Sequence, residues 1–389
     1  MLNACAQKTQ TSSSQATEQK GKSEKFQIVH GPYLFGLTDT EVTLVWVTNQ
    51  PAKSWVEYNP SSGAFYKSEP LRAYQVEHGL HALGTVHSIR LKGLTPGTRY
   101  TYRVMSQCIA DPRPYRAVMG EIIGTDVWKK PLSFTTFPTN ATAVKFKMVN
   151  DIHGKPDLLA ALLTGTTPKN TDFVIFNGDM ASHITDESSL FAGFLDQSVK
   201  SFATQLPIWY TRGNHETRGY FARDLIKYFP QPGGKFYTGF RHGPVYFLIL
   251  DCGEDKPDTD VEYSGLVAFD QYRSEETEWI RQVVESPEFK SATFRVAVCH
   301  MPFPNGGWHG PEYMKREWMP ILKNAKIDVL LSGHTHQTKL TKPTADCPFP
   351  VFENSNSTVL LGSGDGKTMS FQVKTAEGEV KESLQIEAK

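Results

Sequence analysis

The stretch "LLSGHTHQ", Leu330 to Gln337, ends an apolar run with a glycine and then places two histidines one residue apart. The run "IDVLL" before the glycine is typical of a strand buried on both faces, as strands are inside an α/β domain. His334 and His336 would then stand at the carboxyl end of that strand, the edge at which α/β sheets bind ligands. Stability of a buried strand does not require two histidines there, so the pair indicates a functional site.

Several other apolar runs end in the same kind of side chain. The runs "VKFKMVND", "FVIFNGDM", "LPIWYTRGNH" and "FRVAVCHMPF" are separated by helical stretches such as "KPDLLAALLTG" and "SLFAGFLDQSVKSF". This order predicts an α/β domain over residues 144–389, with β-sheet layers flanked by helices. "SEETEWIRQVVES" predicts a helix that begins at Ser274, and the alternating C-terminal segment predicts further antiparallel strands.

Metal-binding side chains gather at these predicted strand ends. They are Asp151, His153, Asp179, Asn214, His215, Glu216, His300, His334 and His336. Each histidine alone is more simply a satisfied surface or core residue, but folding does not explain the whole set in these positions. The set is too large for one ion, and a carboxylate can bridge two ions about 3.5–4 Å apart. The sequence therefore predicts a pair of cations.

Residues 26–138 show the pattern of an all-β domain. In "EVTLVWVT" apolar residues alternate with a period of two, and "LTPGTRYTY" places a turn before a second alternating run. The pattern resembles a fibronectin type III sandwich, and "LTPGTRYTY" is similar to its tyrosine corner, in which a tyrosine hydroxyl bonds the backbone upstream. No cluster of titratable residues gathers here, which favours a spacer or platform over a glycan-binding domain.

The totals of the chain limit its class. Its 389 residues predict two domains, and its 41 basic residues equal its 41 acidic ones. A net charge of zero argues against nucleic-acid binding and leaves a phosphorylated small molecule as the expected partner. No apolar run approaches the ~18 residues that a membrane helix needs. Cys252 and Cys299 lie in apolar runs and are expected to be small core residues.

The first residues predict a lipid-anchored tether. "LNAC" ends at Cys5 and resembles the end of a bacterial lipobox, although the charged and apolar regions of a signal peptide do not precede it. The polar segment that follows has no aromatic or branched apolar residue, so residues 1–25 are expected to be a disordered tether. A lipid anchor at Cys5 would make this an extracytoplasmic bacterial lipoprotein of the periplasm or outer membrane. Nothing in the pattern sets the oligomeric state.

The motifs "DIH", "GDM", "GNHE", "VCH" and "GHTH" occur in this order and resemble the five motifs of the calcineurin-like metallophosphoesterases. Together with the fibronectin-like region, the whole chain resembles purple acid phosphatases and their bacterial relatives. The resemblance implies that Asp179 bridges two metal ions. It implies one set of ligands for each ion: Asp151, His153 and His336 for the first, and Asn214, His300 and His334 for the second.

One position departs from the purple acid phosphatases, in which a tyrosine three residues after the bridging aspartate binds ferric iron. Ser182 stands at that position here, and His153 supplies an imidazole where those phosphatases have no histidine. The imidazole can replace the phenolate, which keeps the number of ligands and removes the coloured iron–phenolate pair. We therefore expect a colourless protein with two divalent ions, drawn from Mn, Fe, Zn or Ni according to availability.

Such a centre predicts hydrolysis by in-line attack of a hydroxide that bridges the two ions. His215, next to Asn214, is the first candidate to protonate the leaving oxygen, because imidazole titrates near neutral pH. Glu216 is expected to orient His215. His309, in "PNGGWHG", is a second catalytic candidate, in competition with a surface role.

Two further residues have alternative roles. Trp308 would form an aromatic wall for the leaving group or merely cover its loop. Arg212 would pair with phosphate or, as the pattern favours, form a structural salt bridge.

Three functions are consistent with the motifs. The leading one is a phosphatase for phosphate monoesters, resembling acid phosphatases. A phosphodiesterase or nucleotidase would use the same metal centre, with loops such as "GEDKPDTDVEYSG" deciding between them. A non-catalytic surface-binding lipoprotein predicts gaps among the ligands, and the sequence shows none.

Overall fold

The computed structural model describes residues 24–61 and 65–389. Cys5 and the predicted tether up to residue 23 lie outside the described residues, so the lipid anchor stays a prediction. Within these two ranges, no helix is both long and apolar enough to cross a membrane.

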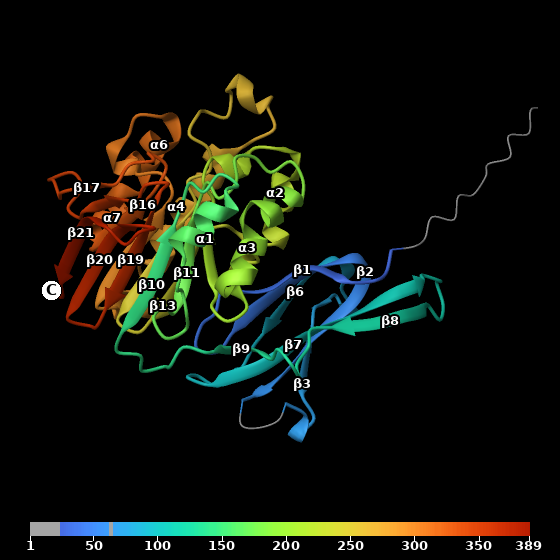
Figure 1. Ribbon diagram of the computed structural model, residues 1–389. Helices are drawn as coiled ribbons and strands as arrows, with labels where there is room; N and C mark the ends of the chain where they lie inside the picture. Colours follow the sequence, from blue (N-terminus) through green and yellow to red (C-terminus); the bar gives the residue numbers. More distant parts are fainter. Residues whose placement is uncertain (1–23, 62–64) are drawn as a thin grey trace, which may run out of the picture.

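The N-terminal domain is a β-rich, sandwich-like unit, shown in blue and cyan in Figure 1. Its strands are β1 (Ile28–Phe35), β2 (Val42–Pro60), β3 (Leu71–Tyr74), β4 (Val76–Glu77), β5 (Leu80–His81), β6 (Leu83–Leu91), β7 (Arg99–Asp111), β8 (Val118–Gly124) and β9 (Leu132–Thr135). The long β2 pairs with β1 and β6 through its first part and with β3 and β7 through its second. A register shift between Val47 and Ala52 separates the two parts, as a β-bulge does when it bends a strand.

The turn before β7 has the geometry expected of a tyrosine corner. The Thr95 N–H donates to Tyr100 Oη over 2.9 Å. The predicted order of a β-rich domain and an α/β domain is confirmed, whereas membership of the fibronectin type III family stays a prediction.

The α/β domain contains two sheets. The first is formed by β10 (Val144–Val149), β11 (Phe173–Asn177), β12 (Ile208–Thr211), β19 (Thr358–Gly364), β20 (Thr368–Thr375) and β21 (Val380–Glu387), in the order β21-β20-β19-β10-β11-β12. The second is formed by β13 (Thr238–His242), β14 (Val245–Leu250), β15 (Phe294–Cys299), β16 (Val329–Ser332), β17 (Lys339–Thr341) and β18 (Val351–Glu353), in the order β13-β14-β15-β16-β18-β17. The predicted C-terminal strands β19, β20 and β21 are antiparallel.

Helices cover the outer faces of the two sheets. The α-helices are α1 (Pro156–Leu162), α2 (Ser188–Leu190), α3 (Asp196–Ser198), α4 (Phe269–Val283), α5 (Pro287–Lys290), α6 (His309–Glu317) and α7 (Met319–Asn324). π-Helical turns, Phe191–Leu195 and Val199–Ala203, continue α2 and α3. Short 3-10 turns span Phe65–Lys67, His215–Thr217, Tyr220–Lys227, Pro232–Gly234, Val261–Tyr263 and Phe303–Asn305.

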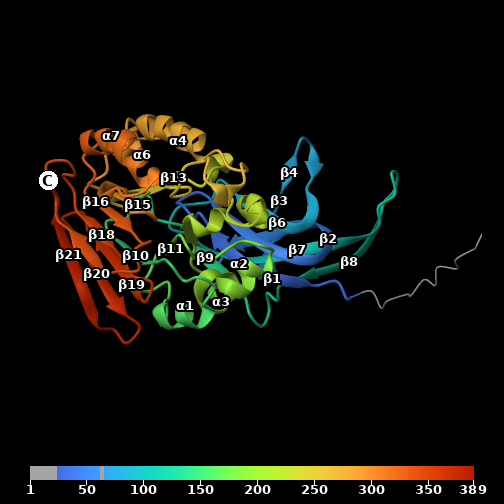
Figure 2. The same ribbon diagram turned by 90° about the horizontal axis from the view of Figure 1, so that it is seen from above.

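The domain therefore has four layers, helix–sheet–sheet–helix. Figure 2 shows α1 to α3 on one side of the strands and α4, α6 and α7 on the other. Between the sheets, the Trp209 and Phe240 rings stack with centroids 3.7 Å apart. β14 lies in the middle of these layers, so it is apolar and buried along its whole length. Cys252 and Cys299 are buried free thiols in the core under α4 and α6, as predicted.

The two domains share one continuous sheet. β1 pairs in parallel with β12 at Phe35 and Ile208. Tyr33 Oη donates to the Tyr228 carbonyl over 2.7 Å, and Tyr102 Oη donates to the Thr204 carbonyl over 2.8 Å.

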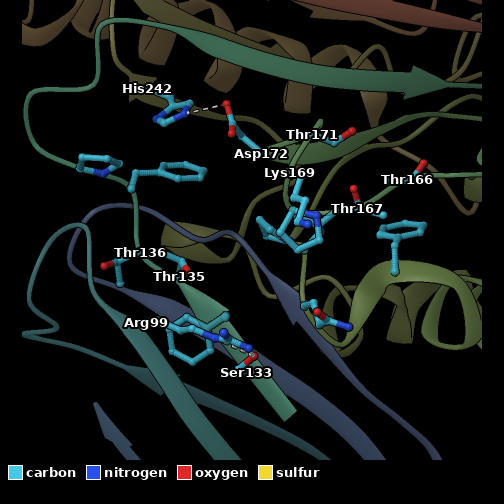
Figure 3. Close-up of a pocket in the computed structure, with 18 of the residues that line it drawn as sticks. Arg99, Ser133, Thr135, Thr136, Thr166, Thr167, Lys169, Thr171, Asp172 and His242 are labelled. Atoms are coloured by element: carbon cyan, nitrogen blue, oxygen red, sulfur yellow. Dashed lines mark hydrogen bonds and ion pairs between the residues drawn. The ribbon is translucent and has the colours of Figure 1, made fainter. Parts of the chain in front are cut away.

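A cavity of about 700 Å³ lies at this junction, between β9 and the segments that precede β11 and β12 (Figure 3). Most of its polar side chains are already satisfied within the protein. For example, Asp172 pairs with His242 over 3.1 Å, and the Arg99 guanidinium donates to Ser133 over 3.0 Å.

The helix predicted to begin at Ser274 begins at Phe269 instead. The reason lies in an earlier loop, because the Asp258 carboxylate accepts the N–H groups of Phe269, over 2.8 Å, and Asp270, over 3.1 Å. A carboxylate that accepts these free amides stabilises an additional turn. The prediction was wrong because the sequence around Ser274 does not reveal a cap eleven residues upstream of the helix.

The imidazole of His87 is buried in the N-terminal domain. Its Nε2 lies 2.8 Å from Thr48 Oγ1, and its ring packs on Trp46 with centroids 5.2 Å apart. Burial lowers the pKa of His87 from 6.5 to about 4. Between these two pH values, His87 is thus neutral in the folded domain but protonated in an unfolded chain.

This predicts that His87 contributes to acid destabilisation. As pH falls from 6.5 towards 4, His87 becomes protonated in the unfolded chain but stays neutral in the folded domain. The free energy of unfolding therefore decreases. Between pH 7 and 4.5 the loss due to His87 should be on the order of 2.5 kcal/mol. Urea unfolding of the wild type and of His87→Gln at both pH values measures it. If the free energy of unfolding decreased equally in the two proteins between pH 7 and 4.5, this role of His87 would be contradicted.

Candidate metal centre

Strand ends from both sheets converge on one site. Asp151 follows β10, Asp179 follows β11 and Asn214 follows β12, and these strands are parallel neighbours. His300 follows β15 and His334 follows β16, a parallel pair in the second sheet. Because the carboxyl ends of both sets of strands lie at the same end of the domain, residues distant in sequence meet there.

The first group of candidate ligands is Asp151, His153 and His336. Their ligand atoms all lie within 4.8 Å of one another. His336 Nε2 is 3.2 Å from Asp151 Oδ1, and His153 Nε2 is 3.2 Å from His336 Nε2. The group contains the three residues predicted to hold one cation.

The second group is Asp179, His300 and His334, again with ligand atoms within 4.8 Å of one another. His300 Nε2 is 3.2 Å from Asp179 Oδ2 and 3.9 Å from Asp151 Oδ1, so the two groups adjoin. Asp179 also forms a group with His153 and His215, which places it beside both predicted cation sites.

Unpaired buried atoms show that these residues fit cations. Asp151 Oδ1, Asn214 Oδ1 and His300 Nε2 are buried and have no hydrogen-bond partner. Leaving such atoms unsatisfied is costly unless a ligand pairs with them. Imidazole nitrogens with carboxylate and amide oxygens suit borderline divalent ions such as Zn, Mn, Fe and Ni. The donor set therefore fits two such ions.

The backbone at the ligands is held in a costly conformation. Five ligand residues have φ between 51° and 70°, namely Asp151, His153, Asp179, His334 and His336. Left-handed backbone costs an ordinary residue on the order of 1 kcal/mol and persists where surrounding bonds enforce it. Here Asp151 N–H donates to the Gly178 carbonyl over 3.0 Å, and His153 N–H donates to the Asp179 carbonyl over 2.9 Å. These bonds join the two ligand loops directly.

Each aspartate has one oxygen fixed by the protein. Asp151 Oδ2 accepts the Asn150 side-chain amide, over 2.7 Å, and the His334 N–H, over 2.9 Å. Asp179 Oδ1 accepts the His215 N–H over 3.0 Å. These contacts leave Asp151 Oδ1 and Asp179 Oδ2 directed towards the histidine nitrogens.

Backbone carbonyls orient two of the histidines. His300 Nδ1–H donates to the Asn177 carbonyl over 2.7 Å, and His215 Nδ1–H donates to the Ser182 carbonyl over 2.8 Å. The bond made by one ring nitrogen fixes the tautomer and leaves Nε2 for chemistry. His215 Nε2 lies 3.9 Å from Asp179 Oδ2, so it faces the centre.

Glu216 has a different partner from the one predicted. It is fully buried, and its carboxylate accepts the N–H groups of Gly213 and Asp179, each over 2.8 Å, and of Met180 over 2.6 Å. It does not orient His215, whose Nδ1 is bound by the Ser182 carbonyl instead. Glu216 therefore holds the loop of Asp179 against the loop of Asn214.

The charges of the site favour cation binding. Burial raises the pKa of Asp179, but nearby His300 outweighs it and holds the pKa of this carboxyl below its usual range. Burial lowers the pKa of His300, but Asp179 and Asp151 outweigh it and raise the pKa to about 10. Burial lowers the pKa of His334 to about 4, which keeps its ligand nitrogen free. A cation bound to His300 would displace the proton that balances the two carboxylates.

Sequence reasoning missed three supporting residues. Asn150 and Asn354 bond each other, with Asn354 Nδ2 donating to Asn150 Oδ1 over 2.8 Å. Glu353 is buried and accepts the hydroxyl of Thr335, the residue between the two histidines of the "HTH" motif, over 2.7 Å. Asn150 adjoins the "DIH" motif and could have been noticed, whereas Glu353 and Asn354 carry no local signal.

The remaining candidates lie around the centre. His309 begins α6, and its Nε2 lies 2.8 Å from Asp270 Oδ2. Among the described residues, the His309 ring pairs with Asp270 and with none of the candidate ligands, so its catalytic role stays a prediction. Arg212 Nε donates to Asp251 over 3.0 Å, which is the structural ion pair favoured from the sequence. Trp308 is 54% exposed, with Lys256 Nζ 5.6 Å from its ring centre.

Comparison with known proteins identifies two regions. Residues 144–338 match the calcineurin-like phosphoesterase family, and residues 33–136 match the N-terminal domain of purple acid phosphatases. Purple acid phosphatase 22 of Arabidopsis thaliana is 24% identical over 318 residues, which cover 78% of this chain and 64% of that protein. Purple acid phosphatase 21 of the same plant is 22% identical over 304 residues, covering 75% and 61%.

The chain thus spans less than two thirds of the length of these relatives. Among solved structures, a 5′-nucleotidase from Candida albicans is similar with a TM-score of 0.36 and 14% identity. That similarity covers 56% of this chain and 46% of the nucleotidase.

The shared position of Asp179 predicts the behaviour of its variants. Asp179→Ala should lose most bound metal, because both ligand groups adjoin this carboxylate. Metal per chain, measured by inductively coupled plasma mass spectrometry after desalting, checks this. Asp346→Ala, at an exposed aspartate, is the control and should keep the wild-type content. Full metal content in Asp179→Ala would show that the carboxylate is not a shared ligand.

Proposed function

The chain belongs to the calcineurin-like phosphoesterase family, and on this premise we propose that it is a metal-dependent phosphatase acting on phosphate monoesters. The observation that carries the proposal is the pair of adjoining ligand groups around Asp179. Two groups of this kind match the two-metal sites that hydrolyse phosphate esters. The matched N-terminal region and the plant purple acid phosphatases support the same class of reaction.

Seven residues would hold the cations. Asp179 would be shared, and the remaining ligands divide as the groups do: Asp151, His153 and His336 for one cation, and Asn214, His300 and His334 for the other. When bound, the cations would polarise the phosphoryl oxygens and lower the pKa of a water molecule. The protein contributes fixed positions, because loop-to-loop hydrogen bonds and Glu216 hold the ligands before a substrate arrives.

His215 is the residue proposed to protonate the leaving oxygen. Its Nδ1–H is engaged by the Ser182 carbonyl, so a second proton must reside on Nε2, the nitrogen that faces the centre. Asp179 Oδ2 lies 3.9 Å from this nitrogen. In the protonated state His215 can donate from Nε2 and afterwards accept a proton again.

A monoester suits the charges better than a diester. A phosphate monoester is a dianion near neutral pH, and two cations with a protonated His215 complement that charge. Arg212 is engaged with Asp251, so the phosphate would depend on the metal ions and His215 for its neutralisation.

A pair of synthetic substrates tests the reaction and its preference. We expect p-nitrophenyl phosphate to be hydrolysed with a higher kcat/KM than bis(p-nitrophenyl) phosphate in the presence of Mn or Zn. EDTA should abolish both reactions, because the ligands alone provide no nucleophile. A preference for the diester would assign the phosphodiesterase alternative, and EDTA-resistant turnover would contradict the metal-dependent reaction.

Variants of His215 test its role separately from metal binding. His215→Ala should lower kcat by about 10²–10⁴-fold, the usual contribution of a general acid. Its metal content should remain near that of the wild type, which distinguishes a proton donor from a ligand. His183→Ala, at an exposed histidine that directly follows Ser182, is the matched control. Loss of metal together with activity in His215→Ala would reassign His215 as a ligand.

A further inference from the structure

Exposed apolar side chains are concentrated in the N-terminal domain. Of the sixteen large hydrophobic residues that are exposed in the described parts of the chain, eleven lie between Val29 and Trp128. They include Leu80, 73% exposed, and Trp128, 68% exposed. Solvent-exposed apolar surface gathered in this way commonly marks an interaction site.

Five aromatic rings form a row on this domain, here called the aromatic strip: His81, Tyr74, Trp55, Tyr66 and Trp128. The ring centroids of His81 and Tyr74 are 4.9 Å apart, and those of Tyr74 and Trp55 are 6.2 Å apart. Tyr66 and Trp128 are 5.3 Å apart at the other end. Trp55 lies opposite Tyr74 in the register of β2 and β3, so their side chains share one face of the sheet.

Glu57 joins the two halves of the strip. It is buried, and it lies on the same face as Trp55 because side chains two residues apart in a strand point the same way. Its carboxylate accepts the Trp55 indole N–H over 3.3 Å and the Tyr66 hydroxyl over 3.1 Å. Since a buried carboxylate fixes both rings, the strip is positioned before any ligand binds, which lowers the entropy cost of binding.

Cations accompany the rings. Lys53 Nζ lies 5.7 Å from the Tyr74 ring centre, and Arg103 Cζ lies 5.8 Å from that of Tyr66. Arg72 and Arg103 both contact Glu57, at 3.1 and 3.3 Å. Around Glu57, three cations thus accompany one carboxylate, and the Arg72 side chain is 48% exposed.

This combination fits a chain of sugar rings. The C–H faces of pyranose rings pack against aromatic faces, and ammonium and guanidinium groups bond hydroxyls and carboxylates. A nucleic acid also stacks on aromatic rings, but its affinity requires many cations, and the chain as a whole has no net charge. The local sequence pattern favours a spacer because it shows no cluster of titratable residues, whereas the strip is assembled from rings distant in the sequence.

We propose that the aromatic strip binds an acidic polysaccharide, with sugar rings on Tyr74, Trp55 and Trp128 and with carboxylates at Lys53 and Arg72. The strip lies on β2, β3, β5, the turn Phe65–Lys67 and the loop between β8 and β9, far from the carboxyl ends of β10 and β11 that carry the candidate metal ligands (Figure 1). Polysaccharide binding therefore does not depend on the proposed phosphatase activity.

Affinity electrophoresis of the full chain in native gels tests the proposal. Gels containing alginate or polygalacturonate should retard the wild type, and a gel containing laminarin, a neutral glucan, should retard it less. Tyr74→Ala and Trp128→Ala, in opposite halves of the strip, should each weaken retardation by about five- to tenfold in apparent Kd. Trp128→Phe should recover much of the loss, because it keeps a ring.

Tyr115→Ala is the matched control, because Tyr115 is an aromatic residue of the same domain, 85% exposed and outside the strip. Thermal unfolding establishes that each variant is folded, and Trp128→Ala removes an exposed ring at little risk to the fold. No retardation in either acidic gel would overturn the proposal. The proposal would also be overturned if both alanine variants were retarded as strongly as the wild type. Stronger retardation of the wild type by laminarin than by the acidic gels, or equal retardation by a gel containing oligothymidylate, would overturn it as well.

Discussion

The position of the Asp179 carboxylate is the constraint on which the metal centre depends. It adjoins both ligand groups, and its residue has a left-handed backbone, with φ of 52°. The loop of Asn214 passes so close that a side chain at Gly213 would collide with the Asp179 carboxylate. A side chain at Gly178, whose φ is 78°, would likewise collide with the backbone of Gly213. Two glycines and the backbone N–H groups that donate to the Glu216 carboxylate thus allow the ends of β11 and β12 to meet closely.

The two-sheet architecture follows from the same requirement. One sheet brings Asp151, Asp179 and Asn214 to its edge, and the other brings His300 and the "HTH" pair. Neither sheet alone offers both complete ligand groups. The aromatic core between the sheets, with Trp209 stacked on Phe240, therefore sets the distance between the carboxylates and the histidines. The geometry of the site therefore depends directly on the packing of the core.

Local patterns predicted the order of the domains and pointed to residues that the fold brings together, because strand periodicity and clustered metal-binding side chains are both read from neighbouring residues. Interactions between distant segments could not be read in this way. Glu216 was predicted to orient its neighbour His215, yet it bonds amides of a loop reached only through the fold. The start of α4 depends on Asp258 in a preceding loop. The aromatic strip joins Trp55 to Trp128, and the sequence between them gives no sign of their proximity.

The parallel contact between β1 and β12 has a consequence for dissecting the protein. A fragment beginning near Val144 would keep every metal ligand but lose the strand that covers one side of β12. Bare backbone amides and carbonyls along an uncovered strand recruit strands of other molecules. Excised from its N-terminal partner, the α/β domain would therefore tend to self-associate, and a poor yield of that fragment would not by itself indicate a damaged metal site.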